Sequence, residues 1–387
     1  MKLEYMDYVA KPPAFAMPTQ IRRILPALTV MVLFLVFLSS PYRNIPAHYL
    51  IQKDPRFPRK IWQTWKIDPL GFEEKDLNLA RSWVGRNPDY RYEVLTDRND
   101  LAYVERNFGP DGLNRLDIVY TYRELNARII KADILRYLIM YVEGGVYTDI
   151  DVEALRPISR FVPERYEERD IDMVIGVEID QPEFQNHTIL GQKCMSFCQW
   201  TFMCKPRLPV MLKLVENIIA WLKTVADEQK CGIGDIKLDF DQVISGTGPS
   251  AFTRAVLDDI SERVGRHVPW DPFHNLVESK LVGGVLVLPV EAFAAGQGHS
   301  DSGNHDTKYS LVKHHYHASH WPDNHPRYKH PIFGQVEDCN WNSECVAKWD
   351  NDKAEFEKLS PEEKTKQITL KEIKDREERE KEHKEGR

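Results

Sequence analysis

The stretch KADILRYLIMYVEGGVYTDIDV, from Lys131 to Val152, decides the fold of this chain. Its first half belongs to a longer segment, Ala127 to Val142, that is mostly apolar. In a helix, the apolar side chains of this segment would lie on nearly every side. We therefore expect a buried helix. Gly144 and Gly145 follow directly and are available for its C-terminal cap and exit turn. A strand-like segment comes next, so the stretch predicts a helix, a sharp break and a short strand.

The acids that close this stretch, Asp149 and Asp151, have one residue between them. In a regular strand the side chains alternate, so both acids would project on the same face as Tyr147. Two carboxylates held this close repel each other, and a divalent cation is the usual reason for tolerating such a pair. The sequence therefore predicts a metal site at the end of the strand.

Strand and helix signals alternate on both sides of this stretch. The predicted strands are Arg59–Lys66, Tyr90–Asp97, Asp172–Ile179 and Lys280–Val290, and the predicted helices are Phe72–Pro88 and Pro209–Asp227. The opening order of strand, helix and strand favours an α/β fold with a mainly parallel sheet flanked by helices.

A glycine-rich turn from Gly246 to Pro249 precedes another predicted helix. Helix N-termini of this kind bind anions or sugar hydroxyls well. An ordinary structural turn explains the same pattern equally well, so both interpretations stay open.

The composition sets the class of protein. The chain has 387 residues, 42% of them hydrophobic, which is enough for one large globular domain, predicted over residues 57–350. A net charge of −7 excludes a general attraction to nucleic acid, so phosphate would be handled by a local site. The charged run over residues 351–387 has little apolar surface to pack, which predicts a solvated helix or a disordered tail outside the catalytic domain.

The N-terminal part contains an uncharged apolar run, Ile24 to Ser40, of about the length that spans a bilayer. Basic residues are concentrated before it, which predicts residues 1–23 in the cytosol, a transmembrane signal anchor over 24–40, a stem over 41–56 and a luminal body. A cleaved signal peptide or a buried helix are the alternatives.

The six cysteines all follow this run, and their even number agrees with an oxidising lumen. Cys339 and Cys345 are the expected local disulfide pair. A zinc site formed by Cys194, Cys198 and Cys204 is the alternative for the first three, although their spacing matches no standard ligand pattern.

The predicted helix also contains Asp133 and Arg136, which are three residues apart and therefore share one face. They would either form an internal salt bridge that orients the helix or emerge beside the two acids that follow it. Ligands of open α/β sheets lie at the carboxyl ends of the strands, where these acids are predicted. A hard cation there would bridge the carboxylates to a substrate diphosphate, which is the chemistry of a nucleotide-sugar donor.

Four segments of the chain resemble a known family. They are RKIWQTWK at Arg59, the stretch from Lys131 to Val152, TGPSAFT at Thr247 and HHYHASHW at His314. Together they resemble glycosyltransferase family 32, which includes the fungal initiation-specific α-1,6-mannosyltransferases. The resemblance implies a GT-A fold and a retaining transferase that uses GDP-mannose with Mn²⁺ or Mg²⁺, as a single-pass type II protein of the Golgi membrane.

The resemblance also implies roles for individual residues. Asp151 would bind the metal directly, Asp149 would contact the ribose and a metal-bound water, and Asp133 with Arg136 would hold the donor sugar. The nucleotide pocket would be lined by Trp62, Gln63, Thr64, Trp65, Tyr147 and Thr148.

The histidine-rich segment is expected to close the metal site, and His315 is the predicted ligand, because Mn²⁺ accepts imidazole beside carboxylates. An independent zinc site, or ordinary surface and cleft histidines, are the alternatives. No nucleophile can be assigned from the sequence, since Glu143, Glu153 and Glu178 are all candidates.

The acceptor implied by the resemblance is a mannose-bearing N-glycan of a glycoprotein, with an α-1,6 linkage formed, within a possible Golgi mannosyltransferase complex. An inositol-phosphoceramide sphingolipid is the alternative acceptor, and a UDP-activated donor stays open. A non-enzymatic luminal protein with a structural metal is the competing class.

Overall fold

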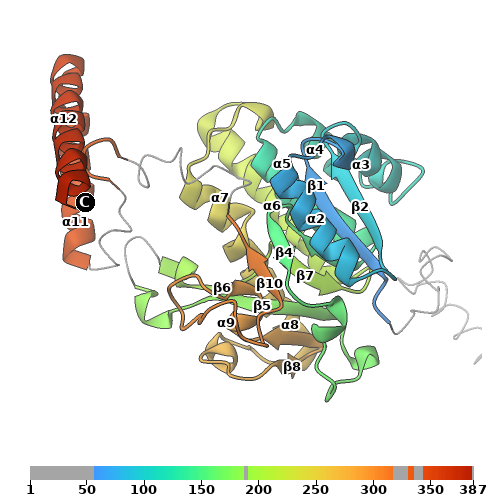
Figure 1. The fold of residues 1–387 in the computed structure, drawn as a ribbon. Coiled ribbons are helices and arrows are strands. Elements are labelled where there is room, and N and C mark those ends of the chain that lie inside the picture. The colour runs from blue at the N-terminus through green and yellow to red at the C-terminus, as the bar shows by residue number, and fades with distance from the viewer. Residues whose placement is uncertain (1–55, 187–190, 317–329, 335–342, 386–387) are drawn as a thin grey trace, which may run out of the picture. The chain divides into compact units, whose positions relative to one another are not determined.

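The computed structural model describes residues 56–186, 191–316, 330–334 and 343–385 (Figure 1). The predicted anchor and stem lie outside these residues. Among the helices that are described, none combines the length and the apolar character that crossing a membrane requires.

The described residues form one eight-stranded sheet with the order β2-β1-β3-β7-β5-β9-β8, and β6 pairs with β5. A second sheet of two strands, β4 and β10, lies apart from it. The strands are β1 Lys60–Trp65, β2 Arg91–Thr96, β3 Gly145–Thr148, β4 Val152–Ala154, β5 Met173–Asp180, β6 Met195–Phe197, β7 Thr201–Cys204, β8 Lys280–Val282, β9 Val285–Leu288 and β10 Val312–His314.

The sheet is mixed, so the prediction of a mainly parallel sheet is wrong, whereas the α/β class is confirmed. The pairs β1-β2, β1-β3 and β5-β9 are parallel. Four other pairs are antiparallel: β3-β7, β5-β6, β5-β7 and β8-β9. Antiparallel strands can follow each other through short turns, and the predicted strand Lys280–Val290 is such a hairpin. It turns at Gly283 and Gly284, whose φ angles are 56° and 82°.

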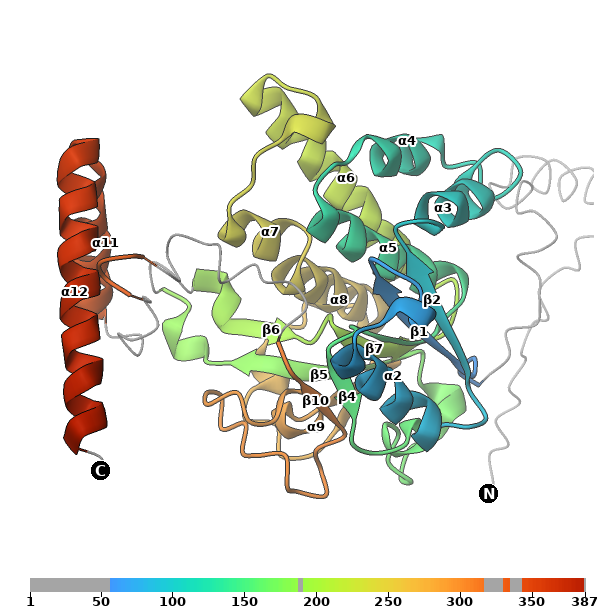
Figure 2. The same cartoon turned by 45° about the horizontal axis from the view of Figure 1, so that its top comes forward.

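Helices cover both faces of the sheet (Figures 1 and 2). One core packs Trp62, Tyr147 and Phe202 of the sheet against α3, α4, α5, α6 and α8. A second core packs the opposite face against α2 and α9. The helices of the body are α2 Glu74–Arg86, α3 Asp100–Phe108, α4 Leu116–Glu124, α5 Arg128–Val142, α6 Pro209–Gln229, α7 Phe240–Gly246, α8 Pro249–Val264 and α9 Val290–Ala294.

The helix, break and strand predicted around the glycines are confirmed by α5 and β3. Gly144 and Gly145 have φ angles of 62° and 97°, a region that residues with a Cβ rarely adopt. A Cβ at Gly145 would also lie 2.6 Å from the carbonyl oxygen of Lys60. The two glycines therefore let the chain leave the helix and enter the sheet directly beside β1.

The strand ends one residue before the acids, which corrects the prediction that Asp149 and Asp151 alternate along a strand. The segment from Asp149 to Asp151 is a turn, closed by a hydrogen bond of 3.2 Å from Val152 N to Asp149 O. The chain then enters β4. The two acids are therefore presented by a turn at the carboxyl edge of the sheet.

The predicted tail is helical where it is described. Helix α11 (Ser343–Glu357) runs across the predicted domain boundary at residue 350, and α12 (Pro361–Glu385) follows. Cys345 is disulfide-bonded, and its predicted partner Cys339 lies outside the described residues. The cysteines at 194, 198 and 204 are free thiols.

Candidate active site

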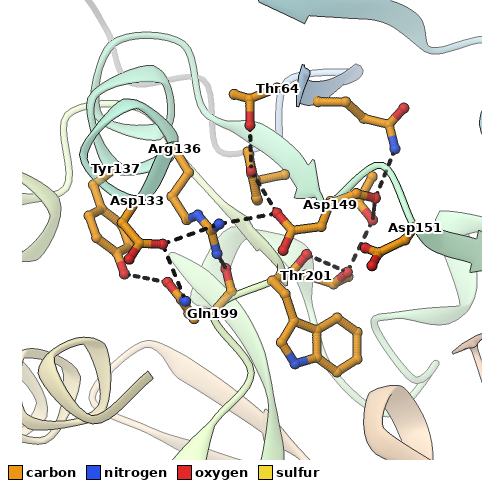
Figure 3. A network of polar contacts seen from close by, with 12 residues as sticks. Thr64, Asp133, Arg136, Tyr137, Asp149, Asp151, Gln199 and Thr201 are labelled. Atoms are coloured by element: carbon orange, nitrogen blue, oxygen red, sulfur yellow. Dashed lines mark hydrogen bonds and ion pairs between the residues drawn. The ribbon is translucent and has the colours of Figure 1, made fainter. Parts of the chain in front are cut away.

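Arg136 is the centre of a polar network at the carboxyl end of β3 (Figure 3). Its Nη2 lies 3.3 Å from Asp133 Oδ1 and 3.2 Å from Asp149 Oδ1, and its Nη1 donates to the carbonyl oxygen of Gln199 at 3.1 Å. The Arg136 side chain is only 6% exposed. One buried guanidinium thus joins the helix to the turn, so the salt bridge within α5 and the emergence beside the acids are both present.

Asp133 is held from three sides. In addition to Arg136, its carboxylate accepts hydrogen bonds from Thr247 Oγ1 at 2.6 Å and from Gln199 Nε2 at 3.4 Å. Burial raises the pKa of Asp133 to about 6, against the opposing effect of Arg136. Thr247 comes from the glycine-rich turn, so that turn is part of the site through its hydroxyl.

Asp149 is more accessible than its partners, with 24% of its side chain exposed. Its Oδ1 accepts a hydrogen bond of 2.7 Å from the hydroxyl of Tyr147, which in turn lies 3.0 Å from Thr64 Oγ1. The Arg136 guanidinium lies over the Tyr147 ring at 5.0 Å. Burial raises the pKa of the Asp149 carboxyl, and Arg136 opposes this effect.

The side chain of His314 lies beside Asp151, whereas His315 contacts Asp151 through its backbone N–H, and its role as a metal ligand stays a prediction. His314 Nε2 is 3.2 Å from Asp151 Oδ1, whereas His315 Nε2 is 3.1 Å from Glu153 Oε2. The reason is the pairing of β10 with β4, in which His314 lies opposite Val152, and successive side chains of a strand point to opposite faces. The rest of the histidine-rich segment, residues 317–321, lies outside the described residues.

The residues present are suitable for holding a divalent cation. Asp149 and Asp151 supply oxygen ligands from one turn, and Nδ1 of His314 is buried with no hydrogen-bond partner among the described residues. Within the described parts of the chain, no group of three or more acidic, histidine or cysteine side chains is arranged as a complete metal cage. A cation here would therefore take its remaining ligands from a diphosphate and from water, as Mg²⁺-type sites do.

The predicted nucleotide residues of β1 differ in how close they lie to the two acids. Thr64 contacts Tyr147, and Gln63 donates to the carbonyl oxygen of Asp149 at 3.0 Å. Trp62 is 6% exposed and packs on Tyr103, with ring centroids 6.3 Å apart. The structure therefore places Gln63 and Thr64 next to the acids, whereas Trp62 belongs to the core.

Two more predicted nucleotide residues contact the turn or the residue that begins it, and Thr148 Oγ1 donates to Asp149 O at 3.5 Å. Trp65 is half-buried and packs with Phe72 and Ile150 on the side of α2. Thr148 is fully buried, with its Oγ1 3.1 Å from that of Thr201. Trp65 therefore packs against the turn, and Thr148 fixes the end of the strand that precedes it.

Sequence reasoning missed a second layer of the site, centred on Trp200. Its carbonyl oxygen accepts the backbone N–H of Asp149 at 2.8 Å, and its indole N–H donates to Glu178 Oε1 at 2.8 Å. Its ring packs against His314 at a centroid distance of 4.5 Å. No pattern in the sequence marks Trp200, because its role depends on β7 lying between β3 and β5.

Glu178 is the one of the three candidate acids that the structure brings to this edge. It lies near the carboxyl end of β5, accepts a hydrogen bond of 3.2 Å from Ser196 Oγ, and has its pKa raised by burial. Glu143 instead pairs with Lys60 at 2.5 Å, and Glu153 contacts His315. Glu178 lies near the end of a strand that the sequence predicts, and this position is a signal that could have identified it.

Residues 73–168, which contain the turn and α5, match the family described as "Glycosyltransferase sugar-binding region containing DXD motif". Over 294 residues the chain is 31% identical to the initiation-specific alpha-1,6-mannosyltransferase of Schizosaccharomyces pombe, an alignment that covers 72% of this chain and 70% of that protein. The chain belongs to this glycosyltransferase family. The family predicted from the sequence is therefore confirmed, and the chain is an enzyme of the glycosyltransferase class.

Two further relatives match the chain to different extents. The initiation-specific alpha-1,6-mannosyltransferase of Candida albicans is 27% identical over 287 residues, covering 69% of this chain and 72% of that protein. Inositol phosphoceramide mannosyltransferase 3 of Schizosaccharomyces pombe is 34% identical over 102 residues, 26% of each chain. The likeness to the first kind of relative spans most of the chain, whereas the likeness to the second spans a quarter of it.

Proposed function

We propose that this glycosyltransferase moves mannose from GDP-mannose to a mannose-bearing N-glycan of a glycoprotein and forms an α-1,6 linkage with retention, on a GT-A fold. The observation that carries the proposal is the turn that presents Asp149 and Asp151 beside the Asp133–Arg136 pair. That arrangement offers carboxylates for a cation and a buried guanidinium for developing negative charge within one network. The names of the full-length relatives support mannose as the sugar.

Each residue of the network has a proposed task. Asp151 and Asp149 hold the cation, and when bound, Mn²⁺ or Mg²⁺ acts as a Lewis acid that neutralises the departing diphosphate. Asp133 and Arg136 hold the donor sugar, and Tyr147 and Thr64 border the nucleotide. Arg136 is fixed before the substrate arrives, so its charge stabilises the leaving group without reorganisation.

The retaining reaction needs no protein nucleophile. The acceptor hydroxyl approaches on the face of the leaving group and passes its proton to the departing phosphate. Glu178, whose carboxylate is held by Trp200 and Ser196, is then available to stabilise positive charge on the sugar ring in the transition state.

An inositol-phosphoceramide acceptor is the second candidate. The relatives whose names contain this acceptor match about a quarter of this chain. The extent of the match favours the glycoprotein acceptor. A Golgi location, the type II anchor at residues 24–40 and membership of a mannosyltransferase complex belong to the same proposal, because the luminal side is where such acceptors are exposed.

The test is the consumption of nucleotide sugars by the full-length chain in detergent with Mn²⁺. GDP-mannose should be consumed and UDP-sugars should not. Asp151→Asn should lower transfer at least about 100-fold, the size of effect seen when one electrostatic group of an active site is lost. The exposed Asp227→Asn, on α6, is the matched control and should keep full activity.

The melting temperature of both variants separates chemistry from folding. Inactive Asp151→Asn protein with an unchanged melting temperature supports the proposal. Preference for a UDP-sugar would refute the donor, and unchanged activity of Asp151→Asn would refute the site.

A further inference from the structure

A cavity of about 520 Å³ lies between α6, α7 and α8, outside the polar network of Figure 3. Helix α8 lies against both α6 and α7, and Figure 2 shows the three helices near one another. Its volume falls within the roughly 300–1,000 Å³ of ordinary small-molecule sites. None of the residues assigned above to the donor or the metal lines it.

The lining combines one aromatic side chain with several polar ones. Trp221 of α6 is half-buried, and the exposed side chains of Asn217, Gln242, Arg254 and Asp258 surround it. The floor is apolar, formed by buried residues of α6 and α8. A flat aromatic ring with amides and carboxylates around it is the combination that binds the apolar face and the hydroxyl groups of a sugar.

The charges of the lining select against anionic ligands. Asp241 is ion-paired with Lys193, and Asp239 caps α7 through a hydrogen bond of 2.8 Å to Gln242 N. Arg254 adds a positive charge, and its guanidinium donates to Ser245 O at 2.8 Å. The lining has three carboxylates, Asp239, Asp241 and Asp258, against Arg254 and the paired Lys193, so a net negative charge remains that disfavours phosphates. The carboxylates and amides can accept hydrogen bonds from the hydroxyl groups of a neutral ligand. A neutral polyhydroxyl compound matches this lining best.

The cavity is joined to the candidate active site by two consecutive residues. The Trp221 ring rests on Gly246, where an added Cβ would lie 2.3 Å from the indole. The next residue is Thr247, whose hydroxyl donates to Asp133 and whose carbonyl oxygen accepts from Tyr137 at 2.8 Å. A ligand that contacts Trp221 would therefore lie on one side of the segment Gly246–Thr247. Asp133, which is proposed to hold the donor sugar, lies on the other side.

We propose that this cavity is a subsite for the neutral, mannose-rich part of the acceptor oligosaccharide, with Trp221 as the stacking platform. The inference rests on the proposed function, because it assigns the cavity to the acceptor of that reaction. The subsite binds sugar units remote from the reacting hydroxyl, so it contributes to acceptor affinity and to preference for long over short acceptors.

The test compares acceptors of two lengths on the full-length chain. Isothermal titration measures the Kd of a purified mannose oligosaccharide, and steady-state kinetics measure KM and kcat with that oligosaccharide and with methyl α-mannoside. Trp221→Ala should weaken oligosaccharide binding and raise its KM about tenfold, the effect expected when an aromatic anchor is removed. The KM for methyl α-mannoside should change much less.

Two further variants guard against misfolding and chance effects. The double variant Asn217→Ala, Asp258→Ala changes only exposed polar lining and should raise the oligosaccharide KM in the same direction. Lys223→Ala changes an exposed residue of α6 that does not line the cavity and should leave both values unchanged.

The outcomes separate this inference from the proposed function. Mannose transfer with an unaltered oligosaccharide KM in both cavity variants would overturn the subsite and leave the function standing. Oligosaccharide binding that depends on Trp221, in a protein that consumes no GDP-mannose, would support the subsite and overturn the function. Binding of a lysine-rich peptide instead of the oligosaccharide would overturn the sugar assignment.

Discussion

At the scale of single residues, the site depends on one guanidinium shared by two carboxylates. Asp133 and Asp149 both contact Arg136 Nη2, so neither has a full positive charge to itself. Burial disfavours an ionised carboxylate, and a shared partner compensates this only in part. The pKa values of both carboxyl groups are accordingly raised.

The raised pKa of Asp133 predicts a pH dependence of stability. The pKa is 3.8 in the unfolded chain and about 6 in the fold. The folded state therefore binds the Asp133 proton more tightly than the unfolded chain does. The contribution of this proton to the free energy of unfolding is complete below pH 4 and is lost as the pH rises through 6. Urea unfolding at pH 4, 5, 6 and 7 measures the free energy of unfolding. This free energy should fall less with rising pH in Asp133→Asn than in the natural chain. Equal slopes would contradict the burial effect.

Glu178 is predicted to act on the reaction through its charge. Glu178→Gln keeps an oxygen that can accept from Trp200 and removes the negative charge, so we expect kcat to fall about 100-fold with little change in donor KM. Trp200→Phe should lower kcat less, since the carboxylate is loosened but kept. The exposed Glu164→Gln is the control.

A merely structural role of Glu178 would give a different pattern. Its loss would then lower the melting temperature of Glu178→Gln, and kcat would follow the fraction of folded protein. Full activity in Glu178→Gln would reject a role for this charge altogether.

At the scale of elements, the exit from α5 into β3 determines where the acids lie. Gly144 and Gly145 both have positive φ, and the strand that follows is only four residues long. Strand β3 is paired on both sides, with β1 and β7, so its register is fixed. A change in where the two glycines end α5 would change that register and move the turn that holds the acids.

Gly145→Ala is predicted to destabilise the fold. A Cβ there would lie 2.6 Å from Lys60 O at a φ of 97°, and such a strained position costs about 1–3 kcal/mol. Gly85→Ala is the matched control, because a Cβ at this helical glycine meets nothing within 4 Å. That change should stabilise the protein by about 0.4–1 kcal/mol. Urea unfolding measures both, and equal effects would contradict the argument.

At the scale of the whole molecule, the candidate active site draws on both ends of the described body. The polar network around Arg136 takes residues from α5, β3 and the turn before α8, and His314 comes from β10, more than a hundred residues after the acids. None of the contacts described for this site involves a described side chain of α11 or α12. Trp349 and Phe356 of α11 pack instead with His330 and Phe333.

Removal of residues 361–387 is predicted to leave transfer and melting temperature unchanged. Helix α12 is rich in charge, and among its residues 361–376, whose side chains are described, none is buried, so this part contributes little to the core. The truncated chain keeps the contacts of Trp349 and Phe356. Activity of the truncated and full chains on the same oligosaccharide decides the matter, and a loss of more than twofold would contradict the prediction.

The sequence by itself indicated the family through its resemblance, and it predicted helix α5, the glycine break and the grouping of Asp133, Arg136 and Asp149. These features are local, since helical spacing, the special backbone freedom of glycine and a short motif can be read within about twenty residues. The mixed sheet, the position of the His314 side chain beside Asp151 and the contacts of Trp200 with Asp149 and Glu178 were decided only by the tertiary structure. They depend on which strands pair and in which register, and pairing between distant segments is set by the packing of the whole core rather than by neighbouring residues.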